Sequence, residues 1–114
     1  MMGLFDRSSG GEPTNPDEVS HQALDAALKA DSWTLVDVRE PYEFDAGHVS
    51  GSLNLPLSRF EPSQLPDGKP VVLICRSGVR SATAMQRARA AGVAEIRHYR
   101  GGVIGWANEG GELV

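Results

Sequence analysis

The sequence predicts an α/β fold in which helices cover both faces of a parallel sheet. Two apolar stretches, the mostly apolar residues 33–38 and the four consecutive apolar residues 71–74, have the composition of strands that are buried on both faces. Each stretch is followed by residues that favour a helix, and strands that alternate with helices along a chain form parallel sheets. A chain of 114 residues is long enough for one such domain with a single hydrophobic core.

The elements follow one another in a regular order. Leu24, Ala27 and Leu28 form the apolar stripe of a helix, and Gly92 is a stop signal for the helix that begins at Arg80. The prolines and the glycine of residues 61–69 indicate a loop. Helices are therefore expected up to residue 30 and at 41–46, 80–91 and 103–108, and strands at 33–38, 52–55, 71–74 and 95–99.

The first 14 residues differ from the rest of the chain. They are rich in glycine and serine and contain little that a core could bury. We expect residues 1–14 to form a flexible N-terminal segment and residues 15–114 to form a single domain.

The overall composition excludes several classes of protein. The net charge of −4 argues against a general nucleic-acid-binding protein. No apolar stretch approaches the ~18 residues that a membrane span requires, and the N-terminus lacks the apolar segment of a secretory signal. The single cysteine excludes an internal disulfide and suits a reducing compartment, so a cytoplasmic location is expected.

Cys75 stands directly after the apolar strand 71–74, at the end of the sheet where open α/β proteins bind their ligands. Gly78 allows a tight loop, whose backbone N–H groups can point inward as a cradle for an anion. The positive N-terminal end of the following helix, together with Arg76 and Arg80, favours the thiolate form of this cysteine. The sequence therefore predicts a nucleophilic thiolate that acts on an anionic substrate.

Two simpler interpretations of these residues stay open. A lone cysteine is often a buried structural residue, and Arg80 could do no more than cap the helix or keep it soluble. The second interpretation leaves Arg76 without a role.

Four motifs of this chain resemble those of the rhodanese (sulfurtransferase) family. Residues 75–80, Cys-Arg-Ser-Gly-Val-Arg, look like the active-site loop of that family, in the form Cys-Arg-x-Gly-x-Arg of its thiosulfate-using members. Residues 35–44 resemble its Asp-Val-Arg segment, and residues 47–56 resemble its Gly-His-Ile-x-Gly-Ala-x-Asn-Ile-Pro signature. Gly101 and Gly102 followed by Trp106 match its closing motif, so the resemblance extends from about residue 19 to residue 106.

The resemblance implies a three-layer α/β/α fold with a five-stranded, mostly parallel central sheet. It places a very short strand at Glu18 and Val19, whereas residues 15–18 alone have the composition of a helix start. The site residues that it implies are Cys75 as the nucleophile, Arg76, Ser77, Gly78, Val79 and Arg80 as the anion cradle, and Asp37, Arg39 and Ser81 in support.

Asp37 and Arg39 close the strand 33–38, which the resemblance places beside the loop. They can brace the loop through charge-assisted hydrogen bonds; the alternative is a surface ion pair of little worth. His48 could pair with a catalytic cysteine, but it falls in what resembles a structural turn, so we interpret it as structural. His21 and His98 have no metal-ligand spacing, and neither a metal nor another cofactor is expected.

The resemblance implies an enzyme like the thiosulfate sulfurtransferases. Such an enzyme moves a sulfane sulfur from an anionic donor such as thiosulfate to a thiophilic acceptor, through a persulfide on Cys75. The expected partners are a small anionic donor and an acceptor that is cyanide, a thiol or a protein, with no nucleic acid and no membrane, in a monomer or a homodimer.

Two alternative functions stay open. One is a cysteine-dependent phosphatase of related fold, although such phosphatases place five residues between cysteine and arginine, and only residues 76–79 lie between them here. The other is a partner-specific sulfur carrier or interaction domain.

Overall fold

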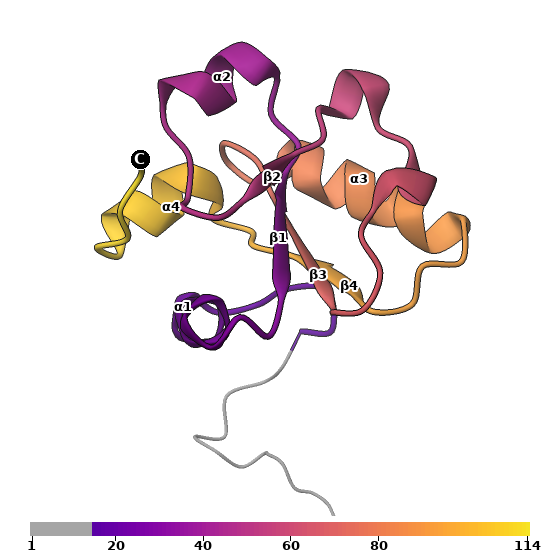
Figure 1. The fold of residues 1–114 in the computed structure, drawn as a ribbon, viewed down its shortest axis with the longest axis horizontal. Helices are drawn as coiled ribbons and strands as arrows, with labels where there is room; N and C mark the ends of the chain where they lie inside the picture. Colours follow the sequence, from indigo (N-terminus) through magenta and orange to yellow (C-terminus); the bar gives the residue numbers. More distant parts are fainter. Residues whose placement is uncertain (1–14) are drawn as a thin grey trace, which may run out of the picture.

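In the computed structural model, which describes residues 15–114, four strands form one sheet (Figure 1). The strands lie in the order β2-β1-β3-β4, and every pair of neighbours is parallel. Their bounds are β1 (Thr34–Asp37), β2 (Leu53–Asn54), β3 (Val71–Ile74) and β4 (Ile96–His98). The predicted parallel α/β architecture is confirmed. The flexible segment expected at residues 1–14 lies outside the described residues.

Helices form the outer layers of the fold. They are α1 (His21–Ala30), α2 (Pro41–Ala46), α3 (Val79–Ala90) and α4 (Gly102–Asn108), and short 3₁₀ turns occupy Leu57–Arg59 and Pro62–Gln64. Figure 1 shows α2 beyond the end of β1, above the sheet in that view. Each of these helices lies within two residues of its predicted position.

The core is divided into two clusters by the central strand β3, all of whose residues are buried. Val71 and Leu73 pack with Ala84 of α3 on one face. Val72 and Ile74 pack with α1 and α4 on the other face. Alternate residues of a strand point to opposite faces, so a strand that is apolar throughout needs helices on both.

The expectation of a fifth strand at Glu18 and Val19 is wrong. Glu18 forms only an isolated parallel bridge with His98. The chain turns just before it, where Glu18 N donates to Asn15 O at 3.1 Å, and Ser20 already caps α1 by accepting from Ala23 N. The turn and the cap leave room for one bridging residue, so the sheet has four strands.

Candidate active site

Cys75 is the first residue after β3, at the carboxyl end of the sheet. Its Sγ accepts hydrogen bonds from the backbone N–H of Gly78 at 3.1 Å and of Ser81 at 3.3 Å. The Ser81 hydroxyl lies 3.5 Å from the same sulfur. Cys75 is only 1% exposed, so it is buried as the structural interpretation expects, but its sulfur faces the polar donors of the loop.

These donors decide the ionisation of the thiol. Burial acts to raise the pKa of Cys75, but hydrogen bonds from the Ser81 hydroxyl and from the N–H groups of Ser81, Gly78 and Ser77 outweigh it. The net result is a pKa of Cys75 below its ordinary value, because each donor stabilises the charged form. The thiolate is the form of cysteine that acts as a nucleophile.

Helix α4 holds the loop in this orientation. Val103 N donates to Cys75 O at 2.8 Å, and Ile104 N donates to Arg76 O at 3.3 Å. The first N–H groups of a helix have no partner within the helix, so they are free to bond the loop. Since C=O and N–H of a trans peptide point in opposite directions, the Arg76 carbonyl held toward α4 turns the N–H of Ser77, which shares its peptide and helps to lower the pKa of Cys75, away from α4.

Two glycines allow this close packing. Gly78 has φ +102°, and a Cβ there would collide with the carbonyl oxygen of Arg100. Gly102 has φ +66°, and a Cβ there would collide with the carbonyl group of Arg76. Both positions combine a left-handed backbone with no space for a side chain, which only glycine satisfies.

Arg80 is tied to α2 by a two-pronged ion pair. Its Nη1 and Nη2 donate to the two carboxylate oxygens of Glu43 at 2.7 and 3.0 Å. The hydrogen bond from Arg80 lowers the pKa of Glu43 to about 2, and in turn the pKa of Arg80 is raised. The side chains are 31% and 17% exposed, respectively. Arg80 therefore connects the loop to α2 as well as carrying charge.

Asp37 and Arg39 form a buried ion pair rather than a surface one. Arg39 donates to both carboxylate oxygens of Asp37 at 2.7–3.0 Å, and its Nη2 also donates to Gly47 O at 2.8 Å. These bonds hold the end of α2 against β1. The pair is connected to the Cys75 loop through α2 and the Glu43–Arg80 link, and through the backbone at the end of β1, where Val38 N donates to Ile74 O at 2.9 Å.

The remaining loop residues lie on the surface. Arg76, Ser77 and Val79 are exposed, and within residues 15–114 Arg76 forms no ion pair. The structure thus brings the donors of residues 77–81 to the sulfur and leaves the charge of Arg76 facing solvent.

Sequence reasoning missed two residues of this neighbourhood. One is Glu43, whose partner Arg80 is 37 residues away. The other is His98, whose Nδ1 lies 2.8 Å from Ser81 Oγ. The available signal for His98 was its position two residues after Ile96 in a predicted strand, which places both side chains on the same buried face.

The other histidines make structural contacts. His48 Nδ1 lies 2.8 Å from Phe44 O, and its ring stacks on Phe44. His21 Nδ1 lies 3.2 Å from Tyr99 Oη.

In residues 15–114 no group of three or more histidine, cysteine, aspartate or glutamate side chains is placed to hold a metal ion. No helix in that part of the chain has the length and apolar character needed to cross a membrane.

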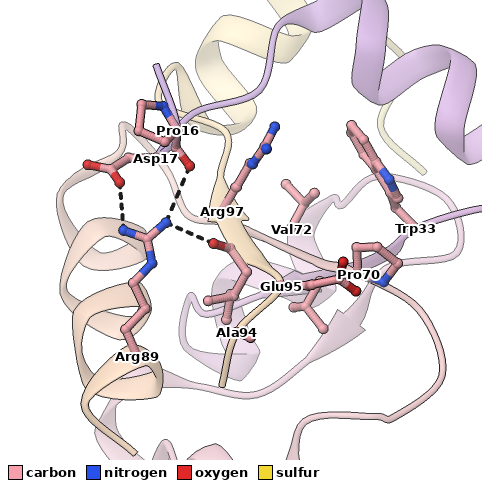
Figure 2. Close-up of a pocket in the computed structure, with 11 residues that line it drawn as sticks. Pro16, Asp17, Trp33, Pro70, Val72, Arg89, Ala94, Glu95 and Arg97 are labelled. Atoms are coloured by element: carbon pink, nitrogen blue, oxygen red, sulfur yellow. Dashed lines mark hydrogen bonds and ion pairs between the residues drawn. The ribbon is translucent and has the colours of Figure 1, made fainter. Parts of the chain in front are cut away.

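A cavity of about 530 Å³ lies at the opposite end of the sheet, between the beginnings of β3 and β4 (Figure 2). Arg89 on its wall donates to Asp17 Oδ1, Pro16 O and Ile96 O. Trp33 and Arg97 line other parts of it. Arg89 is thus already paired within the protein, and the cavity is separate from the Cys75 loop.

Comparison with known proteins relates the chain to one family. The chain matches the family model described as "Rhodanese-like domain" over residues 20–109. It is 45% identical over 94 residues to an uncharacterized protein of Synechocystis sp., covering 81% of this chain and 52% of that protein. It is 34% identical over 100 residues to a sulfurtransferase of Allochromatium vinosum, covering 85% and 94%. The chain thus spans about half the length of the Synechocystis relative.

Among solved structures, the fold is similar to that of the human single-domain sulfurtransferase TSTD1. The TM-score is 0.71 and the sequence identity 30%, and the match covers 84% of this chain and 98% of the human one.

Proposed function

Because the chain belongs to the rhodanese-like domain family, we propose that it is a sulfurtransferase that carries a sulfane sulfur on Cys75. The observation behind this proposal is the set of donors around Cys75 Sγ, with Gly78 N at 3.1 Å and Ser81 N at 3.3 Å. Fixed donors that stabilise a thiolate also suit the anionic persulfide that replaces it. The names of the Allochromatium and human relatives support the same activity.

The reaction proceeds by two displacements. The Cys75 thiolate attacks the outer sulfur of an anionic donor such as thiosulfate, a new S–S bond forms, and sulfite leaves with the electron pair of the bond that breaks. An acceptor nucleophile then attacks the outer sulfur of the persulfide, and Cys75 leaves as the thiolate. Both steps balance without an added oxidant or reductant.

The residues of the loop divide the work. Arg76, exposed and without an ion pair in residues 15–114, attracts the anionic donor. The N–H groups of Ser77, Gly78 and Ser81 stabilise the negative sulfur. Arg80, fixed by Glu43, shapes the side of the loop nearest α2. Val79 leaves an apolar side chain at the rim, where an acceptor approaches.

Two features weigh against the phosphatase alternative. Only residues 76–79 lie between Cys75 and Arg80, which makes a smaller loop than the phosphatase motif. The guanidinium of Arg80 also donates two of its hydrogen bonds to Glu43, at 2.7 and 3.0 Å. A phosphoryl group needs those donors, whereas a single sulfur atom is served by the backbone.

We propose a small thiol or a thiol-bearing protein as the acceptor in the cell, with cyanide as a laboratory substitute. The chain has one cysteine, so the thiol has no partner within these residues. A reducing compartment such as the cytoplasm keeps such a thiol free.

Intact-mass measurement after exposure to thiosulfate tests the proposal. We expect wild type to gain one sulfur atom and to lose it again on addition of cyanide, and Cys75→Ala to gain nothing. Phosphorylation by an aryl phosphate without sulfur gain would instead establish the phosphatase. A persulfide that no small acceptor removes would point to a dedicated protein partner, which capture with the persulfide-loaded protein would identify.

A further inference from the structure

We propose that His98 is a positioning residue, whose Nδ1–H directs the Ser81 hydroxyl hydrogen onto the Cys75 thiolate. The inference rests on the proposed role of Cys75 as the nucleophile. It adds a residue from β4 to a site that is otherwise built from the loop before α3 and the first turn of that helix.

The Ser81 hydroxyl has one hydrogen and three neighbours. His98 Nδ1 is nearest at 2.8 Å, Gly78 O follows at 3.2 Å, and Cys75 Sγ is at 3.5 Å. A hydroxyl can donate once and accept as well. The direction of the hydrogen therefore depends on what each neighbour offers.

The histidine tautomer decides that direction. If Nδ1 carries no hydrogen, it accepts a hydrogen bond from the Ser81 hydroxyl, because this is the shortest of the three contacts. The lone pairs of Ser81 Oγ then face the thiolate. If Nδ1 carries the hydrogen, it donates to Ser81 Oγ and leaves the serine hydrogen free. Gly78 O already accepts from Ala82 N at 3.2 Å and is a neutral acceptor, whereas the thiolate carries a full negative charge, so Cys75 Sγ is the stronger acceptor for the freed hydrogen.

The hydrogen bonds that lead from His98 through Ser81 to Cys75, which we call the relay, are strengthened by burial. Ser81 is fully buried, and His98 is 5% exposed, so water does not compete for these bonds. Burial also lowers the pKa of His98; Glu18 and Asp17 oppose this shift, and Arg100 and Arg89 add to it. The neutral ring is therefore the form present near neutral pH, and a neutral ring has one N–H to place.

Thiolate titration in four variants tests the relay. The ultraviolet absorbance of the thiolate reports the pKa of Cys75, and we expect Ser81→Ala to raise it by about one unit. His98→Leu should raise it by a smaller amount, because the serine hydrogen is then shared between Gly78 O and Cys75 Sγ. The double variant should match Ser81→Ala alone, because His98 acts only through that hydroxyl. His98→Asn, which can place an amide N–H near the same point, should restore the wild-type value.

The matched control is His21→Asn. His21 contacts Tyr99 Oη at 3.2 Å, in the cluster on the other face of the sheet, so its loss should leave the pKa of Cys75 unchanged. Equal shifts for His98→Leu with and without Ser81 would overturn the inference, because a merely structural histidine acts in both backgrounds alike.

A second measurement needs no variant. The ¹⁵N shifts of the His98 ring in wild type should show the hydrogen on Nδ1, and a bare Nδ1 would contradict the relay. Both measurements use the resting protein without a sulfur donor. A wild type that takes up no sulfur therefore contradicts the proposed function, whereas additive variants or a bare Nδ1 contradict the relay.

Discussion

At the scale of single residues, neutral donors hold the charge of one sulfur atom. The N–H groups of Gly78 and Ser81 lie 3.1 and 3.3 Å from Cys75 Sγ and the Ser81 hydroxyl lies 3.5 Å from it, and the N–H of Ser77 adds to them. Neutral donors act through position, so a small backbone change near Gly78 affects the thiolate more than the removal of a distant charge.

Replacing Gly78 by alanine tests this dependence on position. The new Cβ would collide with the carbonyl of Arg100 at φ +102°, so the loop must shift and Gly78 N must leave the sulfur. We expect sulfur uptake from thiosulfate to fall by about 100-fold, measured as the rate of mass gain.

The control for this variant is Gly68→Ala. Gly68 has a similar φ of +99° but no neighbour within 4 Å of a Cβ. The Gly68→Ala substitution should lower the unfolding free energy by about 1–2 kcal/mol and leave the rate of sulfur uptake unchanged. Equal loss of rate in both variants would show that general instability, rather than displaced donors, is responsible.

The residues of the site that sequence reasoning predicted are those close together in the chain. Gly78 and Ser81 are three and six residues from Cys75, so a strand, a glycine and a helix start place them without knowledge of the fold. Glu43 and His98 reach the site only through the packing of α2 and β4. A single sequence holds no information on which distant side chains meet.

At the scale of elements, α2 is a support for the Cys75 loop. Arg39 donates a hydrogen bond to Gly47 O, at the carboxyl end of α2, at 2.8 Å. Glu43 of α2 forms an ion pair with Arg80. The sequence predicted Asp37 and Arg39 as direct braces of the loop, but their side chains bond each other and Gly47. The pair therefore reaches the loop through α2 and through the backbone at the end of β1, where Val38 N donates to Ile74 O at 2.9 Å.

Substituting Glu43 by glutamine tests this support. The variant removes the charge of the two-pronged pair, and we expect it to lower the unfolding free energy at neutral pH by about 1–2 kcal/mol. The pKa of Glu43 is lowered from 4.5 to about 2, so the pair stabilises the fold above pH 4.5. That contribution is lost as the pH falls toward 2, and the two proteins should then converge.

Chemical denaturation at several pH values measures this difference. Asp25→Asn is the control, because its pair with Lys29 is largely exposed and should contribute less than 1 kcal/mol. A Glu43→Gln variant as stable as wild type at neutral pH would show that the pair does not support the loop.

The order and type of the elements were predictable because their periodicities are strong. The apolar run 71–74 became the central strand, and residues 41–46 formed the expected helix. The prediction of a fifth strand was wrong because the turn at Asn15 and the helix cap at Ser20 occupy the residues on either side of Glu18. The segment between them is too short to pair as a strand.

At the scale of the whole molecule, a net charge of −4 opposes the approach of an anionic donor. Arg76 provides a positive charge at the carboxyl end of the sheet, where it can attract the donor locally. Replacing Arg76 by alanine should lower kcat/KM for thiosulfate about tenfold at low salt, with a smaller loss at high salt because ions screen exposed charges.

Arg97→Ala is the matched control for Arg76→Ala. Arg97 is also exposed but lines the cavity at the other end of the sheet, so its loss changes the net charge equally but changes the electrostatic field at the loop less than the loss of Arg76 does. Steady-state rates over a series of salt concentrations compare the two. An equal effect of both variants would assign the steering to total charge instead of Arg76.

The decisive measurement is the rate at which wild type gains one sulfur atom from thiosulfate, followed as a function of pH. The hydrogen bonds to Cys75 lower its pKa, so we expect the rate to reach half its plateau below the ~8.5 of a free cysteine. A half-plateau at or above that value, or no gain of mass at any pH, would contradict the account of a thiolate held ready by the loop.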